Sequence, residues 1–397
     1  MKYDFETLVN RAELGSSKWN NMYETNPNVS KDVVPLSVAD MEFKNPPEIM
    51  EGLKKCLDET ILGYTIPTQK YFDAVKSWMK KRHNWDITED SIVCTPGVVT
   101  ALFIGVCAFT EPGDKIMLLT PVYYPFYIAV EGHGRQIVNS SLLEKDGKYE
   151  MDFEDIEEKI VSNDVKLLLL CNPHNPVGRV WTKDELKKLG DICKKHNVFV
   201  ISDEIHNDLI MPGNEHTVFH NVDESFKDFS MVCTAPSKTF NLAGMQVSNI
   251  IITNEELRNK FRMALFVNAA AGFLGTLAYE ACTVAYNECE EWLEELIQVI
   301  HKNSKVVEEF MAEKMPKVKV SKLEGTYLQW LDFREVCDDY KKLEEININK
   351  AEVFFDEGHI FGVEGQGFER INLACPTRVI EETLERLYKT YKELELV

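Results

Sequence analysis

The chain has 397 residues, of which 44% are hydrophobic and 27% are charged, as in ordinary folded globular proteins. Its formal net charge of -21 argues against a nucleic acid or an anionic membrane surface as a partner, because both would repel it. We therefore expect a small-molecule ligand, and a chain long enough to form two domains around a shared core.

The start of the chain and its cysteines indicate a protein of the cytoplasm. The first residues, MKYDFE, contain acids and no apolar core segment, so we expect no secretory signal. Ten cysteines occur without a C-x-x-C pair, which favours free thiols in a reducing cytoplasm over disulfides or a zinc site. The two longest charge-free stretches, 91–110 and 264–279, are interrupted by glycine and polar residues, so we expect buried helices and no membrane span.

Apolar runs alternate with amphipathic stretches through the middle of the chain. This alternation predicts an α/β fold in which a mostly parallel sheet is covered by helices. We expect residues 1–45 to form an N-terminal arm and part of a small domain, and residues 46–286 to form a large domain. Thr182, which is followed by acids, predicts a helix start between two strands. The predicted strands are 115–119, 166–170, 198–201, 231–233 and 249–252.

The pattern changes after Cys289. A long amphipathic helix is predicted there, reaching toward Met315, and a closing helix is predicted after Thr377. Residues 287–397 are therefore expected to form a smaller α+β domain, with the N-terminal arm packed across it. Its predicted short strands lie at 317–333, around 361–363 and at 370–373.

Polar side chains follow three of the predicted strands. The segments are NPHNPVG at 172–178, SDEIH at 202–206 and SKTFN at 237–241. Because the carboxyl ends of parallel strands meet along one edge of a sheet, they would place an amide, a carboxylate and an amine around one crevice. A lysine there is partly desolvated, so the neutral amine that forms an imine with an aldehyde is easier to reach. This combination predicts a pyridoxal 5′-phosphate site.

Each member of this set also has an ordinary structural explanation. Lys238 taken alone would be a solvated loop lysine. Asp203 would be a helix N-cap. It can also be the carboxylate that pairs with the pyridine nitrogen of the cofactor, but both roles hold only if Asp203 is buried. Asn175 would belong to a rigid loop, since each Asn-Pro pair favours extended backbone, instead of facing the phenolic oxygen of the ring. The occurrence of all three together favours the functional interpretation.

Further candidates precede an apolar helix predicted at 100–109 or follow a predicted strand. Free backbone N–H groups at the start of that helix would receive a phosphate, although an ordinary helix start explains the same residues. Ser237, beside the lysine, would add a hydroxyl to the phosphate contacts, although a serine in a loop needs no such explanation. Tyr123 would stack on the ring of the cofactor, but Tyr124 or packing in the core would explain the aromatic cluster equally well. These candidates are Gly97, Val98, Val99, Ser237 and Tyr123.

Two more residues, Tyr64 and Arg370, are too isolated for their spacing to indicate a role. The planar fork of an arginine suits a substrate carboxylate. The default explanation for Arg370 is a pair with Glu369 or with another surface acid.

The three polar segments, together with VADMEF at 38–43 and PVYYPF at 121–126, resemble those of the fold-type I pyridoxal-phosphate enzymes, the aspartate aminotransferase superfamily. Within it, the chain is most similar to the MalY/PatB-type cystathionine β-lyase group, and the likeness runs nearly from end to end. The resemblance implies the transferase fold of that type, with a seven-stranded, mostly parallel sheet. It also implies a homodimer with active sites at the subunit interface.

The resemblance further implies a role for each candidate. Lys238 would bind the cofactor covalently, with Asp203 at the pyridine nitrogen and Asn175 at the phenolic oxygen. Tyr64 would reach the phosphate bound by the neighbouring subunit. The other residues that it implies are Gly97, Val98, Val99, Tyr123, His206 and Ser237 at the cofactor, and Arg370, Asp40 and Tyr123 at the substrate.

Two positions differ from the pattern of the aminotransferases. His206 stands where many of them carry a tyrosine, as is usual for the lyase group. Gln246 stands where a phosphate-binding arginine is often found, which leaves the phosphate contacts open. The resemblance thus points to a carbon–sulfur β-lyase that converts cystathionine or a related cysteine conjugate into a thiol, pyruvate and ammonia. The alternatives are a class I/II aminotransferase, which uses the same three residues, and a non-catalytic regulatory protein that retains the fold.

Overall fold

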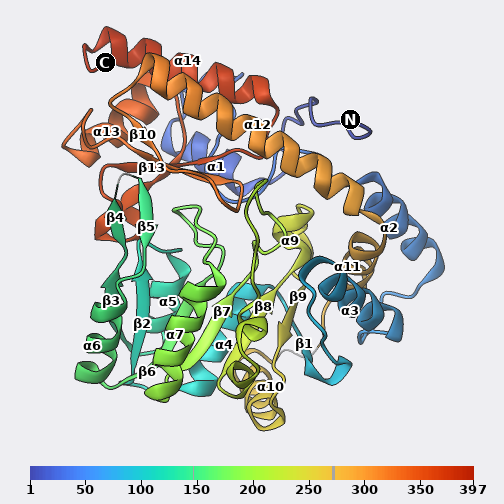
Figure 1. The fold of residues 1–397 in the computed structure, drawn as a ribbon. Coiled ribbons are helices and arrows are strands. Elements are labelled where there is room, and N and C mark those ends of the chain that lie inside the picture. Colours follow the sequence, from blue (N-terminus) through green and yellow to red (C-terminus); the bar gives the residue numbers. More distant parts are fainter. Residues whose placement is uncertain (146, 271–272) are drawn as a thin grey trace.

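The central element of the computed structural model is a large β-sheet whose strands run mostly parallel (Figure 1). The structure describes residues 1–145, 147–270 and 273–397. Within these ranges the sheet has seven strands, in the order β1 (Ile92–Thr95), β9 (Ser248–Ile251), β8 (Ser230–Thr234), β7 (Phe199–Asp203), β6 (Val165–Cys171), β2 (Lys115–Thr120) and β3 (Gln136–Ser141). Strand β9 runs antiparallel to β1 and β8, and the other pairs are parallel. The expected α/β fold with a mostly parallel seven-stranded sheet is confirmed.

The two faces of this sheet are covered by different helices. One face carries α4 (Val98–Phe109), α5 (Pro125–Glu131) and α10 (Glu255–Ala269), and the other carries α6 (Phe153–Asn163) and α7 (Lys183–Lys195). Side chains alternate along β6, so that Leu167 and Leu169 pack with the first group. Leu168 and Leu170 pack with the second. A strand that is buried on both faces needs a continuous apolar run, which is why the sequence reveals it.

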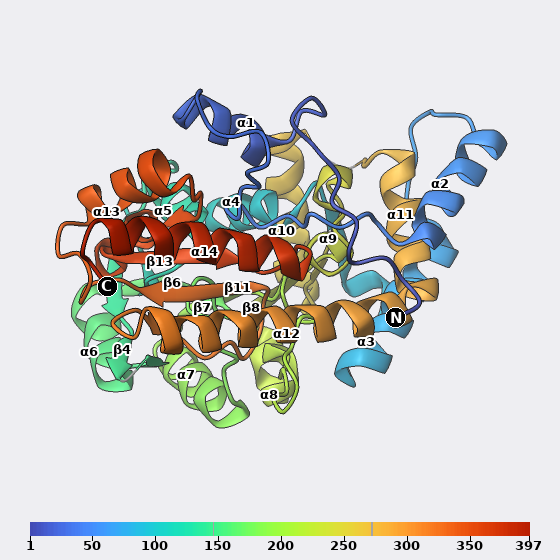
Figure 2. The same cartoon turned by 90° about the horizontal axis from the view of Figure 1, so that it is seen from above.

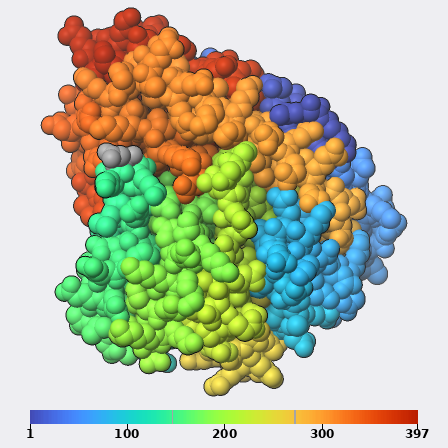
Figure 3. Space-filling model, in the orientation of Figure 1, coloured from blue at the N-terminus to red at the C-terminus, as the bar shows by residue number. Residues whose placement is uncertain are grey.

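A second, antiparallel sheet is formed by the C-terminal part of the chain. Its strands lie in the order β10 (Lys319–Val320), β11 (Leu328–Asp332), β13 (Phe368–Asn372) and β12 (Asp356–Glu357). Two long helices, α12 (Glu290–Lys314) and α14 (Thr377–Glu393), lie side by side next to it (Figure 2). In Figure 3 this part, in orange and red, lies above the light blue, green and yellow part, to which the residues of the seven-stranded sheet belong.

The N-terminal segment is joined to the second sheet by main-chain hydrogen bonds. The backbone N–H of Leu36 donates to the carbonyl of Phe354 at 2.8 Å, and the N–H of Asn372 donates to the carbonyl of Leu36 at 2.9 Å. Helix α1 (Ser17–Thr25) precedes this contact. The beginning and the end of the chain are therefore held together next to the same sheet.

The remaining elements surround these two sheets. Among the residues that the structure describes, no helix is long and apolar enough to cross a membrane. These elements are the helices α2 (Pro47–Glu59), α3 (Gln69–His83), α8 (Phe219–Val222), α9 (Pro236–Thr239), α11 (Thr276–Glu288) and α13 (Tyr340–Ile346), and the hairpin of β4 (Leu143–Lys145) and β5 (Lys148–Glu150).

The prediction that both charge-free stretches are buried helices is wrong in two ways. The stretch 91–110 begins with strand β1, and its helix, α4, starts after Gly97. The stretch 264–279 spans the end of α10 and the start of α11, with residues 271–272 outside the described part. Phe266 and Phe273 are 68% and 60% exposed there. An absence of charge thus marks exposed apolar surface as well as core.

The other predicted elements agree with the structure except near Phe361. The five predicted strands and both helices of the C-terminal part are present, with ends that shift by a few residues. The strand expected around 361–363 is instead a pair of 3-10 turns at Gly358–Phe361 and Val363–Gly365. Gly362, between them, has φ 126°, a left-handed conformation that interrupts a strand.

The start of α7 offers a local test of the fold. The hydroxyl of Thr182 accepts a hydrogen bond from the backbone N–H of Glu185, and the Glu185 carboxylate accepts one from the N–H of Thr182. Thr182→Ala should lower the free energy of unfolding by about 1 kcal/mol, because the backbone N–H of Glu185 loses its side-chain acceptor. Urea titration of Thr182→Ala and of Thr182→Ser, which keeps the hydroxyl, would measure it. Equal urea midpoints for the alanine variant and the wild type would contradict the assignment.

Candidate active site

A cavity of about 380 Å³ lies where the carboxyl ends of β6, β7 and β8 meet the start of α4. The structure brings most of the predicted site residues together in its wall. Three others, Tyr64, Asp40 and Arg370, are not among its lining residues. The predicted residues that line it are Gly97, Val98, Val99, Tyr123, Asn175, Asp203, His206, Ser237 and Lys238.

Lys238 lies in the short helix α9, directly after strand β8. Its side chain is half-buried, and its Nζ donates a hydrogen bond to the backbone carbonyl of Ala39 at 2.6 Å. Desolvation of the amine and the nearby charge of Arg370 lower its pKa to about 8, although Asp40 and Asp203 act in the opposite direction. A neutral amine is therefore far more accessible here than in water, as a nucleophile or a base requires.

Asp203 is the last residue of strand β7, and its side chain is buried in the wall of the cavity. Its Oδ1 accepts a hydrogen bond from the backbone N–H of Ile205 at 3.1 Å. Burial raises its pKa to about 7, against the opposing effects of that hydrogen bond and of Lys238. Residues 205–208 form a turn and no helix, so the interpretation of Asp203 as a helix N-cap is wrong. A buried carboxylate of this kind is stabilised by a cationic group in the cavity.

The start of α4 forms the end of the cavity that suits an anion. Gly97 has φ 88°, a left-handed conformation that favours glycine, and within the described residues no side chain caps the helix after it. The backbone N–H groups of Val98 and Val99 are thus available to a ligand at the positive end of the helix. Ser237 lies in the same wall, together with Gln246.

Asn175 connects the cavity to an arginine behind it. Its Oδ1 accepts a hydrogen bond from Nη1 of Arg370 at 2.8 Å. Arg370 is buried, forms an ion pair with Asp356 and lies 4.6 Å from the ring centre of Phe361. The default explanation that Arg370 pairs with Glu369 or another surface acid is therefore wrong, because strand β13 turns its guanidinium inward.

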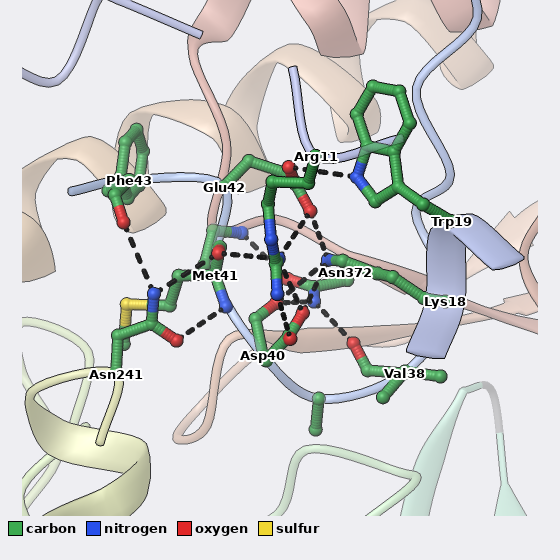
Figure 4. Close-up of polar contacts among 12 residues, drawn as sticks. Arg11, Lys18, Trp19, Val38, Asp40, Met41, Glu42, Phe43, Asn241 and Asn372 are labelled. Atoms are coloured by element: carbon green, nitrogen blue, oxygen red, sulfur yellow. Dashed lines mark hydrogen bonds and ion pairs between the residues drawn. The ribbon is translucent and has the colours of Figure 1, made fainter. Parts of the chain in front are cut away.

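Asp40 lies in a cluster of opposite charges near the cavity (Figure 4). Its carboxylate is 2.7 Å from Nη2 of Arg11 and 2.9 Å from Nζ of Lys18, and both cations also contact Glu42. Burial alone would raise the pKa of Asp40, but the two cations outweigh it and lower the pKa. Its carboxylate is thus already paired within this chain, while its neighbour Ala39 provides the acceptor for Lys238.

Two aromatic rings and a histidine were also predicted for this site. Tyr123 is half-buried, and burial raises the pKa of its hydroxyl, which keeps that hydroxyl protonated. His206 is buried, and burial together with Lys238 lowers its pKa well below the usual value, so the ring is neutral. Tyr64 is 96% exposed and its ring lies 5.8 Å from that of Phe273, on the surface of the chain.

The sequence does not reveal several groups of this site. The carbonyl of Ala39 is a backbone atom, and it also accepts a hydrogen bond from the hydroxyl of Tyr327 at 2.8 Å. The pairing of Arg370 with Asp356 joins positions with no motif between them. Thr100, one residue beyond the predicted phosphate site, also lines the cavity and would be found by extending the helix N-terminus by one position. In the described part of the chain, no group of three or more His, Cys, Asp or Glu residues is placed to hold a metal ion.

These groups fit an aldehyde cofactor with a phosphate and a basic ring nitrogen. A half-buried amine with a pKa of about 8, a buried acid with a pKa of about 7 and an uncapped helix start line one cavity. They would bind an aldehyde, a protonated ring nitrogen and a phosphate, respectively. The geometry thus supports the cofactor that the sequence predicts.

Comparisons with known proteins agree with this geometry. The chain is 44% identical to cystathionine beta-lyase PatB of Bacillus subtilis, over 97% of this chain and 98% of PatB. It is 30% identical to the protein MalY of Escherichia coli, over 96% of each. The crystal structure of cystalysin from Treponema denticola, which contains a pyridoxal 5′-phosphate cofactor, is 55% identical with a TM-score of 0.98, covering 99% of this chain and 100% of that chain.

A second solved structure, the pyridoxal-phosphate-bound C-S lyase of Staphylococcus hominis, is 30% identical with a TM-score of 0.91, covering 98% of each chain. These similarities confirm the transferase fold of type I. A family model described as aminotransferase class I and II matches residues 31–387. The chain therefore belongs to the aminotransferase class I and II family.

Proposed function

We propose that this chain is a pyridoxal 5′-phosphate-dependent carbon–sulfur β-lyase. It cleaves L-cystathionine, or a related cysteine S-conjugate, to a thiol, pyruvate and ammonia. The observation that carries the proposal is the convergence of Lys238, Asp203 and the start of α4 on one cavity. The similarity to cystathionine beta-lyase PatB and to a C-S lyase supports the reaction class.

The lining residues divide into those that hold each part of the cofactor. Lys238 binds its aldehyde carbon, and the carboxylate of Asp203 pairs with its ring nitrogen. Tyr123 stacks on the ring, and the Asn175 amide and His206 lie beside it. The phosphate is held by the N–H groups that follow Gly97 and by the hydroxyl of Ser237, with all of these residues in the wall of the same cavity.

When bound, the cofactor withdraws electrons from Cα of the attached amino acid, which makes the Cα proton acidic. The freed amine of Lys238 takes that proton, and its low pKa keeps it neutral enough to do so near pH 8. The carboxylate of Asp203 keeps a proton on the ring nitrogen. Arg370 binds the substrate carboxylate, and its contact with Asn175 connects it to the cavity. The thiolate then leaves from Cβ, and the unsaturated amino acid that is released reacts with water to give pyruvate and ammonia.

We also propose a homodimer in which Tyr64 reaches the phosphate of the neighbouring subunit. The loop that carries it is strongly apolar and exposed, with Ile61 at 89%, Leu62 at 66% and Ile66 at 64% exposure. Exposed apolar patches of this kind are typical of protein interfaces.

All ten cysteines fall in the described ranges and are free thiols, which supports a reducing compartment such as the cytoplasm.

The reaction is tested by mixing the purified, cofactor-loaded protein with L-cystathionine, L-cystine and L-methionine in separate assays. From L-cystathionine we expect pyruvate, ammonia and thiol in equal amounts, without any added 2-oxo acid, and no pyruvate from a Lys238→Ala variant that retains its fold. L-cystine should give pyruvate, ammonia and a persulfide, whereas L-methionine, whose sulfur is bonded to Cγ, should give no pyruvate. Turnover that requires a 2-oxo acid and releases no ammonia would assign an aminotransferase instead. Wild-type rates in Lys238→Ala would contradict the proposed role of the lysine.

The carboxylate at position 203 is tested by Asp203→Asn. The amide has the same shape but cannot balance a protonated ring nitrogen, so we expect pyruvate release to fall about 100-fold or more. Cofactor content, measured by absorbance, should stay close to that of the wild type. Asp228→Asn, in the surface turn before β8, is a matched control. An Asp203→Asn variant with unchanged turnover would refute this role.

The lowered pKa of Lys238 predicts a pH dependence for the cofactor-free protein. The amine reacts when neutral, so the rate constant for combination with pyridoxal 5′-phosphate should rise through a midpoint near pH 8. Below that pH the ammonium form dominates and the reaction slows. Stopped-flow absorbance between pH 6 and pH 10 measures the midpoint, with borohydride trapping and peptide mapping to locate the label. A midpoint near 10.5, the ordinary pKa of lysine, would be inconsistent with a desolvated amine.

A further inference from the structure

A buried acid that does not line the cavity lies behind the helix that carries Lys238. Asp208 belongs to the turn that follows β7, five residues after Asp203, and its side chain is almost fully buried. Its oxygens accept hydrogen bonds from Nε1 of Trp78 at 3.2 Å and pair with Nε2 of His83 at 2.9 Å. These two donors come from α3, so the acid is fixed from one side by a helix outside the cavity wall.

The remaining contact of this acid leads to the site. The hydroxyl of Thr239 donates a hydrogen bond to Oδ2 of Asp208 at 2.8 Å, and Thr239 is fully buried. Thr239 directly follows Lys238 in α9, a helix of only four residues. A helix this short has little rigidity of its own, because few of its backbone groups are bonded within it. Its orientation therefore depends on bonds to the surrounding structure.

The acid is ionised, which makes it a strong acceptor for this hydroxyl. Burial alone would raise its pKa, but the hydrogen bond and charge of His83, the charge of Arg82 and the bond from Thr239 outweigh burial and lower the pKa of Asp208. Hydrogen bonds to an ionised acceptor are stronger than those between neutral groups. The hydrogen bond from Thr239 to Asp208 is therefore a strong one.

The residues that follow α9 are held by a different side chain, that of Asn241. Asn241 has φ 55°, and its amide accepts a hydrogen bond from the backbone N–H of Met41 and donates to the carbonyls of Met41 and Phe43 (Figure 4). The turn around Lys238 is therefore clamped between the segment next to Ala39 on one side and Asp208 on the other.

We propose that Asp208 is a positioning residue, which through the hydroxyl of Thr239 fixes the direction in which Lys238 enters the cavity. This inference rests on the proposed function, because it gives Lys238 a reaction to perform. The loop after β7 has Asp203 at its start and Asp208 near its end. One loop therefore positions both the acid that would face the cofactor ring and the acid that holds α9 through Thr239. A misplaced amine loses rate steeply, since proton transfer and bond formation need close alignment.

The test removes the hydroxyl and leaves the charges in place. Thr239→Val has nearly the same shape without the hydroxyl, Thr239→Ala also lacks it without any risk of overpacking, and Thr239→Ser retains it. Two quantities are measured: the rate constant for pyridoxal 5′-phosphate combining with the cofactor-free protein, and kcat and KM for pyruvate release from L-cystathionine. For the valine and alanine variants we expect both the combination rate constant and kcat to fall about tenfold, with KM within about twofold of the wild type.

The serine variant should lie within about twofold of the wild type in every quantity, because it restores the bond. Thr110→Val is the matched control: Thr110 is buried, its hydroxyl donates to the carbonyl of Val106 at 2.6 Å, and it lies at the far end of α4 from the phosphate site. That control should lower the temperature of unfolding without changing either rate. Such a result separates a positioning effect from a general loss of stability.

The outcomes distinguish this inference from the proposed function. Wild-type rates in both hydroxyl-free variants, or a serine variant as slow as the valine variant, would overturn the role of Asp208. The combination rate is measured without any amino acid, so it tests the positioning even where cystathionine is not the substrate. A wild-type protein that binds the cofactor but releases no pyruvate would refute the lyase assignment alone.

Discussion

The register of three parallel strands is the constraint on which the site depends. Cys171 of β6 pairs with Asp203 of β7, which in turn pairs with Cys233 of β8. Asn175 and Lys238 follow Cys171 and Cys233 by a few residues, so they emerge side by side at one edge of the sheet. A slip of one residue in β7 would turn Asp203 to the opposite face, and the cavity would lose its acid.

The same burial that stabilises the sheet edge tunes the two charged groups there. Desolvation disfavours the ionised forms of Asp203 and Lys238 alike, so it raises the pKa of the acid and lowers the pKa of the amine. One physical cause thus brings two groups of opposite type into the neutral pH range. Arg370 adds to the effect on the lysine, and its own charge is balanced by Asp356 behind the cavity.

Local patterns allowed much of this fold and site to be predicted. Strands such as β6 are continuous apolar runs, and the polar segments after them are short and contiguous, so the lysine, the acid and the asparagine could be placed in order. Strand β1 was hidden in a charge-free stretch because a buried strand and a buried helix have the same composition. The sequence around Gly362 likewise has the composition of a short strand, although the segment forms two 3-10 turns.

Contacts between distant parts of the chain could not be predicted in this way. The pairing of Asp40 with Arg11 and Lys18, the pairing of Arg370 with Asp356, and the link from Thr239 to Asp208 depend on how segments far apart in sequence pack together. The hydrogen bond from Lys238 to the carbonyl of Ala39 has a particular consequence of its own. Because its acceptor belongs to the main chain, any side chain at position 39 that keeps the local path of the backbone also keeps this bond. The hydrogen bond itself therefore sets no requirement on the side chain of residue 39, whose size is limited instead by burial in the cavity wall.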